Sequence, residues 1–248
     1  MKKIVISQPM FFPWVGIFEQ MRLSDVFIHY DSVLLPQGRS FMTRVRIKAH
    51  QGKGWLSMPI KRSGLARQII KTVQSDDSYN WRKAHLRTLQ MEYAKAPYRD
   101  DVLSIVEEVY ALKTTYCSEL NIFAAEKIAN YFSFSCQFVR SSNFKLPDGK
   151  CEKLLSLIGA MGGDIYITGL GGLNYMDYEL FETNHVYIKF MDYQSIAYPQ
   201  QHGTFDPFVS ILDLIANLGK EGKYVINSQA IYWKEFTNPK TQKRITIG

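Results

Sequence analysis

The residues best suited to chemistry lie in a polar, proline-framed loop at 198–207, Tyr-Pro-Gln-Gln-His-Gly-Thr-Phe-Asp-Pro. His202 stands beside a glycine in this loop, and the ordinary pKa of an imidazole suits proton transfer near neutral pH. Asp213 follows between apolar neighbours, where a carboxylate needs a partner. We predict His202 and Asp213 as catalytic residues, with Asp213 orienting His202 or binding an arginine. The alternative for His202 is a hydrogen-bonding surface role.

Two further loops lie between a predicted strand and a predicted helix. The loop at 8–16 reads Gln-Pro-Met-Phe-Phe-Pro-Trp-Val-Gly, and the glycine turn at 168–175 reads Thr-Gly-Leu-Gly-Gly-Leu-Asn-Tyr. N–H groups at such junctions attract phosphate, and glycine lets a ligand approach the backbone closely. Neither loop matches the Walker or Rossmann pattern, so a purely structural turn is the alternative for each. The predicted binding residues are Gln8, Gly16, Gly169, Gly171 and Asn174.

Small polar residues follow two other predicted strands. Asp31 ends the second strand, and Ser141 and Ser142 follow the strand that ends at Arg140. Hydroxyl groups at the carboxyl end of a strand suit sugar or phosphate oxygens, although such residues also form local turns. We predict Asp31, Ser141 and Ser142 as substrate-binding residues.

Positive charge is concentrated in one segment. Residues 36–99 contain 14 Lys/Arg and three Asp/Glu, a net +11, whereas the rest of the chain sums to −4. Such an excess attracts a nucleotide diphosphate, nucleic acid or a membrane surface, or else forms a solvated face. Within this segment we predict further substrate-binding residues: Arg44, Arg46, Arg82, Lys83 and His85. A structural role is the default interpretation of His85, which shares a helix face with Trp81.

The composition excludes several classes of protein. With 248 residues, 46% hydrophobic and 21% charged, the chain is neither disordered nor collagenous nor a coiled coil. No window approaches the ~20 apolar residues of a membrane span, and no signal peptide is recognisable. Three well-separated cysteines favour neither disulfides nor structural zinc. We expect a cytoplasmic protein with no metal site, and the absence of RNA-binding signatures makes nucleic acid an unexpected partner.

The elements that must position these residues follow an α/β rhythm. Buried strands are predicted at 3–7, 26–30, 137–140, 164–168 and 186–191, with helices at 15–23, 151–161, 174–181 and 205–218. This pattern predicts a mostly parallel, Rossmann-like sheet flanked by helices. A basic β-hairpin spans 44–60, and a helical insertion spans about 78–133. We expect a single domain at 1–236 and a disordered basic tail at 237–248.

Several stretches, in order along the chain, resemble the WbqC-like protein family. They are Gln8–Gly16, Phe27–Asp31, Trp81–Leu86, Ala96–Tyr98, Ser141–Ser142, Tyr166–Gly169, Tyr198–Phe205 and Pro207–Leu214. The resemblance implies a bacterial protein of polysaccharide or O-antigen (lipopolysaccharide) biosynthesis.

Substrates in that setting are nucleotide-linked sugars, and many of them carry an amine that is later acylated. We therefore predict a transferase that N-acylates or N-aminoacylates a nucleotide-linked amino sugar, with acyl-coenzyme A or another acyl donor. One alternative is an ATP- and magnesium-dependent amide ligase, although 14–17 reads Trp-Val-Gly-Ile and lacks the His-x-Gly-His signature of nucleotidylyl transferases. Another is a non-catalytic scaffold that binds anions or nucleic acid. The sequence leaves the oligomeric state open.

Overall fold

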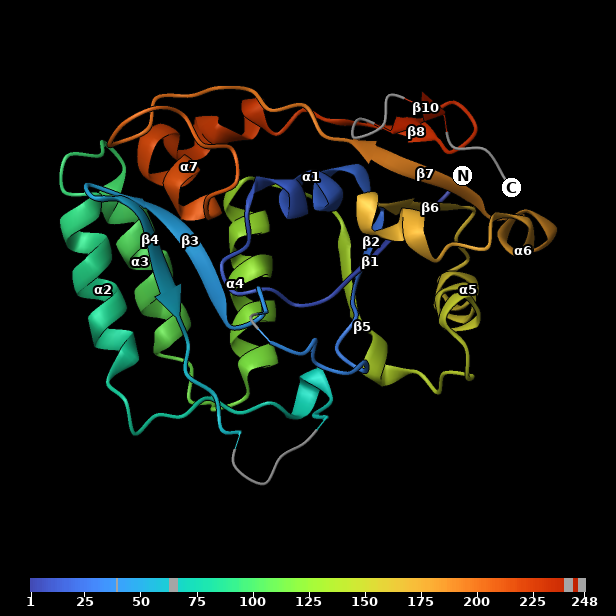
Figure 1. Ribbon diagram of the computed structural model, residues 1–248, viewed down its shortest axis with the longest axis horizontal. Coiled ribbons are helices and arrows are strands. Elements are labelled where there is room, and N and C mark those ends of the chain that lie inside the picture. The colour runs from blue at the N-terminus through green and yellow to red at the C-terminus, as the bar shows by residue number, and fades with distance from the viewer. Residues whose placement is uncertain (39, 63–66, 239–242, 245–248) are drawn as a thin grey trace.

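The computed structural model describes residues 1–38, 40–62, 67–238 and 243–244 (Figure 1). Within these residues, six strands form one sheet in the order β5-β2-β1-β6-β7-β8. All neighbours are parallel except β8, which pairs antiparallel with β7. The strands are β1 (Lys3–Ser7), β2 (Val26–His29), β5 (Gln137–Arg140), β6 (Ile165–Thr168), β7 (Tyr187–Asp192) and β8 (Gln229–Tyr232). The predicted mostly parallel α/β fold is confirmed.

Both faces of the sheet are covered, because the central strands are apolar on both sides. In β1, Val5 belongs to one buried cluster, whereas Ile4 and Ile6 belong to the other. Helix α1 (Val15–Leu23) contributes to the first cluster. Helices α5 (Lys150–Ala160) and α6 (Tyr178–Thr183) contribute to the second.

The predicted hairpin and helices lie between β2 and β5 in the sequence. The hairpin pairs β3 (Arg44–Ala49) with β4 (Gly52–Ser57) and forms a separate antiparallel unit. A short 3-10 turn, η1 (Ile70–Thr72), precedes three helices. They are α2 (Trp81–Glu92), α3 (Arg99–Tyr110) and α4 (Cys117–Tyr131). Figure 1 shows α2 and α3 together with the hairpin and α7 (Ile211–Leu218), on the far side of the molecule from α5 and α6.

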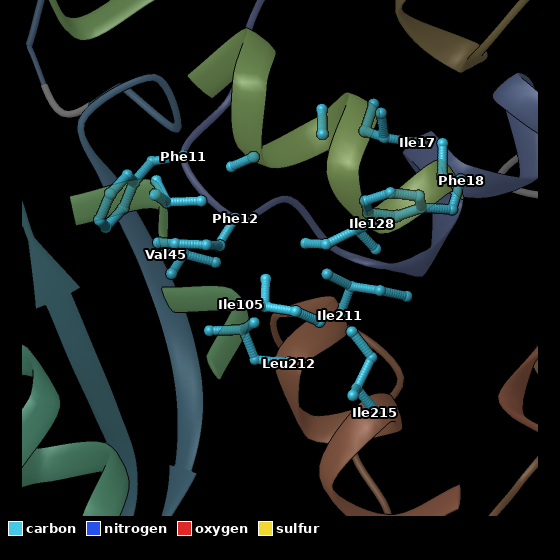
Figure 2. Packing of buried hydrophobic residues seen from close by; sticks show 14 of the residues in the cluster. Phe11, Phe12, Ile17, Phe18, Val45, Ile105, Ile128, Ile211, Leu212 and Ile215 are labelled. Carbon is cyan, nitrogen blue, oxygen red and sulfur yellow. The ribbon is translucent and has the colours of Figure 1, made fainter. Parts of the chain in front are cut away.

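One apolar core joins the loop after β1 to this helical part. Figure 2 shows Phe12 from the loop, Val45 from β3 and Ile105 from α3 converging with Ile128 from α4 and Ile211 from α7. All five side chains are almost completely buried. The loop between β1 and α1 is therefore anchored by packing against elements that are distant in the sequence.

Two predicted helices begin later than expected. Helix α7 (Ile211–Leu218) was predicted from 205, but Asp206 accepts a hydrogen bond from the Phe208 N–H at 2.9 Å in a turn, and Ser210 caps the helix instead. The helix predicted at 174–181 begins only at Tyr178, as α6, and Asp177 caps it. A 3-10 turn, η3 (Leu170–Asn174), precedes it. The edge strand β8 was not predicted.

The remaining described elements are short. They are η2 (Ser141–Asn143), η4 (Gly219–Val225), β9 (Thr237–Asn238) and β10 (Lys243–Arg244). In the tail predicted to be disordered, β9 pairs antiparallel with β10, while 239–242 and 245–248 lie outside the described residues. None of the helices in the described part of the chain is long and apolar enough to cross a membrane. The three cysteines are buried, and none of them forms a disulfide bond.

Ser210 joins three segments that are far apart in the sequence. Its buried N–H donates to the carbonyl of Arg46 at 2.8 Å, and its Oγ donates to the carbonyl of Phe12 at 2.8 Å. The next N–H, of Ile211, donates to the carbonyl of Pro13 at 2.9 Å. The start of α7 is thereby fixed to both the hairpin and the loop after β1.

We expect Ser210→Ala to lower the free energy of unfolding by about 1–2 kcal/mol, because it removes a helix cap and leaves the buried Phe12 carbonyl unpaired. Ser104→Ala, at an exposed position of α3, is the matched control and should leave stability nearly unchanged. Urea unfolding measures both. Equal stability of the two variants would contradict the role assigned to Ser210.

Candidate functional site

A cavity of about 690 Å³ lies at the carboxyl edge of the sheet, where the strand order reverses between β1 and β6. In open parallel sheets this reversal is where ligands bind. The cavity is bounded by Ser7 and Gln8 after β1, by Thr168 and the glycine turn after β6, and by Asp192 at the end of β7. We call it the switch-point cavity. Of the predicted binding residues, Gln8, Gly169 and Gly171 line it.

Three aromatic rings form one wall of the switch-point cavity. The Trp14 ring lies 4.8 Å from Tyr193 and 5.5 Å from Phe208, measured between ring centroids. Gly16 makes this possible, because a Cβ there would lie 2.3 Å from the Trp14 ring. Gly16 was predicted to let a ligand approach the backbone; here its missing side chain makes room for Trp14 instead.

Three tyrosines, Tyr30, Tyr166 and Tyr175, also line the cavity. Burial raises the pKa of all three, that of Tyr30 to about 12, so the hydroxyls are neutral at physiological pH. They can both donate and accept hydrogen bonds. No lysine or arginine is found among the described residues that line this cavity, and Asp192 is its sole carboxylate. The cavity is therefore aromatic and polar but not cationic.

Asp31, Ser141 and Ser142, predicted to bind substrate, bind one another. Oδ1 of Asp31 accepts hydrogen bonds from Ser141 Oγ at 3.0 Å and from the Ser142 N–H at 2.9 Å. Oδ2 accepts one from Ser142 Oγ at 2.7 Å. These hydrogen bonds connect the end of β2 to the end of β5, and Asp31 is almost fully buried between them. It does not line the switch-point cavity.

A second hollow, of about 560 Å³, lies between the hairpin and the loop at 202–208. We call it the histidine hollow, because His50 and His202 both line it. Phe208 lines both this hollow and the switch-point cavity. The two spaces are therefore neighbours that share one aromatic side chain. The basic hairpin borders only the second of these spaces.

The three basic residues of β3 are already engaged. Arg46 forms an ion pair with Asp206 at 2.8 Å, and Lys48 Nζ donates to the carbonyl of Thr204. Arg44 stacks on Trp55, with its guanidinium carbon 3.5 Å from the ring centroid, and lines neither space. Arg46 and Lys48 thus fasten the loop that carries His202, rather than standing ready for phosphate.

His202 contacts Glu92, a residue that the sequence did not single out. Its Nε2 lies 3.0 Å from the Glu92 carbonyl oxygen and 3.2 Å from Oε2. Nδ1 of His50 lies 2.9 Å from Oε1 of the same carboxylate. One feature of the sequence could have indicated Glu92. It is the last residue of α2, where the negative end of the helix dipole disfavours a carboxylate, so the carboxylate needs donors from elsewhere in the fold. His50 gave no signal, because only the fold brings β3 to α2.

The predicted pairing of Asp213 with His202 is wrong. Oδ1 of Asp213 accepts a hydrogen bond from the Tyr198 hydroxyl at 3.0 Å, and Oδ2 has no hydrogen-bond partner among the described residues. Tyr198 in turn accepts one from Gln200 Nε2 at 3.1 Å. From α7, the Asp213 carboxylate faces Tyr198 at the start of the loop, whereas the His202 ring faces Glu92 at the end of α2. Asp213 therefore supports the loop from beneath.

Of the remaining predicted residues, Arg82, Lys83 and His85 lie outside both spaces. Arg82 forms an ion pair with Asp77 at 2.8 Å, and Lys83 is exposed on α2. Burial lowers the pKa of His85 to about 4, and its Nδ1 lies 2.9 Å from the Tyr110 hydroxyl, so this neutral imidazole is a core residue. Asn174 ends η3, and its side chain falls outside what the structure describes. Within the described residues, no group of three or more His, Cys, Asp or Glu side chains is arranged to hold a metal ion.

A parallel α/β sheet with a ligand-sized cavity at its switch point defines a Rossmann-like protein. The chain belongs to the WbqC-like protein family, whose model matches residues 8–224 and so spans both spaces. It is similar to "Uncharacterized protein Rv1507c" of Mycobacterium tuberculosis (strain ATCC 25618 / H37Rv), with 32% identity over 223 residues, covering 89% of this chain and 96% of that protein. No solved structure matches the chain.

Asp213 makes stability depend on pH. Burial raises its pKa in the folded protein to about 7, above the value of about 3.9 in an unfolded chain. The unfolded chain therefore releases this proton first, and the folded state loses stability as pH rises from about 4 to about 7. Asp213→Asn cannot ionise, so we expect its stability relative to the native protein to rise across this window, by a few kcal/mol at most. Thermal unfolding from about pH 4.5 to about pH 8 measures this difference, and parallel curves would contradict it.

Proposed function

We propose that this protein transfers an acyl or aminoacyl group to the amine of a nucleotide-linked amino sugar. The observation that carries the proposal is the lining of the switch-point cavity: aromatic walls and neutral hydrogen-bonding groups, with a single carboxylate and no described basic side chain. A sugar ring has apolar faces of C–H groups and an edge of hydroxyls. Aromatic rings pack against the former, and neutral side chains hydrogen-bond the latter.

The individual groups suit a sugar ring. Trp14 and Tyr193 meet edge to face, with ring planes 72° apart, and both line the cavity. Gln8 and Thr168 supply an amide and a hydroxyl from the ends of adjacent strands, and Asp192 supplies an acceptor for two sugar hydroxyls. With no basic side chain in the described lining, the diphosphate would rely on N–H groups of the glycine turn.

Two adjoining spaces suit a reaction of two substrates. We place the sugar in the switch-point cavity with its amine directed past Phe208, and the acyl donor, a thioester such as acyl-coenzyme A, in the histidine hollow. His202 would accept a proton from the amine as its nitrogen bonds to the acyl carbon. The C–S bond then breaks, and the imidazolium returns the proton to the departing sulfur. This bacterial polysaccharide role accords with the family resemblance.

Ligand binding to the switch-point cavity can be tested by thermal shift with UDP-, dTDP- and GDP-linked amino sugars. At 100 times its dissociation constant, a ligand should stabilise the protein by about 2.7 kcal/mol. Trp14→Leu should abolish the shift, because it removes the central ring of the aromatic wall. Trp55→Leu is the matched control, since Trp55 lies under Arg44 outside both spaces. A shift with none of these sugars would overturn the proposal.

Transfer itself is tested with His202→Asn. We expect amide formation to fall by at least about 100-fold because the proton acceptor is lost. Sugar binding should be retained, because His202 does not line the switch-point cavity. His185→Asn is the matched control. Like His202, His185 has a left-handed backbone, with φ of 58° against 63°, but it is exposed and lines neither space. Full activity of His202→Asn would remove His202 from the mechanism, and a requirement for ATP would favour the ligase.

A further inference from the structure

The hydrogen-bonding chemistry around Glu92 fixes the protonation of His202. A backbone carbonyl can only accept a hydrogen bond, and Nε2 of His202 lies 3.0 Å from the carbonyl oxygen of Glu92. Nε2 must therefore carry the hydrogen in the neutral ring. The lone pair is then on Nδ1, the nitrogen that does not face Glu92. A base can only use the nitrogen that holds its lone pair.

The same carboxylate fixes His50 in the opposite tautomer. Nδ1 of His50 lies 2.9 Å from Oε1 of Glu92, and a carboxylate only accepts, so Nδ1 carries the hydrogen here. The backbone N–H of His50 also donates to Oε2 at 2.8 Å. His50 therefore holds Glu92 through two donors, one on each oxygen. Neutral histidine in water favours hydrogen on Nε2, so this tautomer of His50 is imposed by its surroundings.

The backbone at His202 is unusual as well. His202 and Gly203 both adopt left-handed conformations, with φ of 63° and 67°. A side chain at such a position is strained, and strain of this kind persists where the surroundings hold it. Here the loop is held by the contact of His202 with Glu92 and by the Lys48 and Arg46 contacts with Thr204 and Asp206. The ring is thus fixed in the wall of the histidine hollow.

We infer that Glu92 is the positioning residue of the transfer reaction, that Nδ1 of His202 is the atom that accepts the proton, and that His50 holds Glu92 in place. This inference rests on the proposed function. Glu92 is almost fully buried, and its Oε2 lies 3.2 Å from Nε2 of His202. When Nδ1 takes the proton of the amine, the carboxylate offsets the charge of the imidazolium. Asp213 has no part in this arrangement.

The inference is tested by NMR of the ¹⁵N-labelled full chain, about two pH units above the ordinary imidazole pKa of about 6.5. We expect hydrogen on Nε2 of His202 and on Nδ1 of His50. In Glu92→Gln, the amide oxygen should stay on the His50 N–H, so the amide NH₂ faces His50 Nδ1. His50 should then move its hydrogen to Nε2, while His202 keeps its own. An unchanged His50, or hydrogen on Nδ1 of His202, would overturn the inference.

Kinetics provide the second readout. Glu92→Gln should lower kcat of transfer by about tenfold or more with little change in KM for the sugar. His50→Ala, which removes the side-chain donor to Oε1 and leaves the His202 side chain in place, should lower kcat less. A normal kcat in Glu92→Gln, with transfer still dependent on His202, would refute the positioning role and leave the proposed function standing. If no amino sugar is acylated by the native protein, the proposed function fails, whereas the tautomers remain testable by NMR.

Discussion

The arrangement of both spaces depends on the junction at Ser210. Its N–H and hydroxyl bind the carbonyls of Arg46 and Phe12, so the start of α7 is fixed to β3 and to the loop after β1. Phe208, two residues earlier, is thereby placed against Trp14. Together with the hydrogen bond from the Phe11 N–H to the Phe41 carbonyl at 2.9 Å, this junction keeps the switch-point cavity of the sheet beside the histidine hollow of the insertion.

Part of the positive charge of the insertion holds the fold together. Arg46 pairs with Asp206, Arg82 with Asp77, and Lys48 binds a carbonyl of the loop at 198–208. The contacts of Arg46 and Lys48 join segments that are distant in the sequence, whereas Arg82 and Asp77 lie five residues apart. Part of the net +11 of residues 36–99 is therefore engaged within the fold and does not by itself mark a phosphate site. Charge counts along a sequence cannot distinguish a cation that recruits a ligand from one that fastens a loop.

The sequence predicted the sheet and its carboxyl edge well, because buried strands followed by polar or glycine-rich loops have a local signature. Gln8, Gly169 and Gly171 were found in this way. Trp14, Tyr193 and Phe208 were not, since an aromatic residue that lines a cavity looks the same in sequence as one in a core. Asp213 was recognised as unusual, but its partner depends on the rotation of α7, which only tertiary packing sets. Glu92 and His50 likewise meet only through the fold.

The central claim is that the two spaces form one bipartite site across Phe208. Titration of the ¹⁵N-labelled protein with a UDP-linked amino sugar tests it most directly, by following the Trp14 indole N–H and the His202 imidazole nitrogens together. The claim predicts that both signals shift along the same saturation curve, with one Kd. A shift of Trp14 with no response at His202 would contradict it, because the sugar would then occupy the switch-point cavity without reaching the histidine hollow.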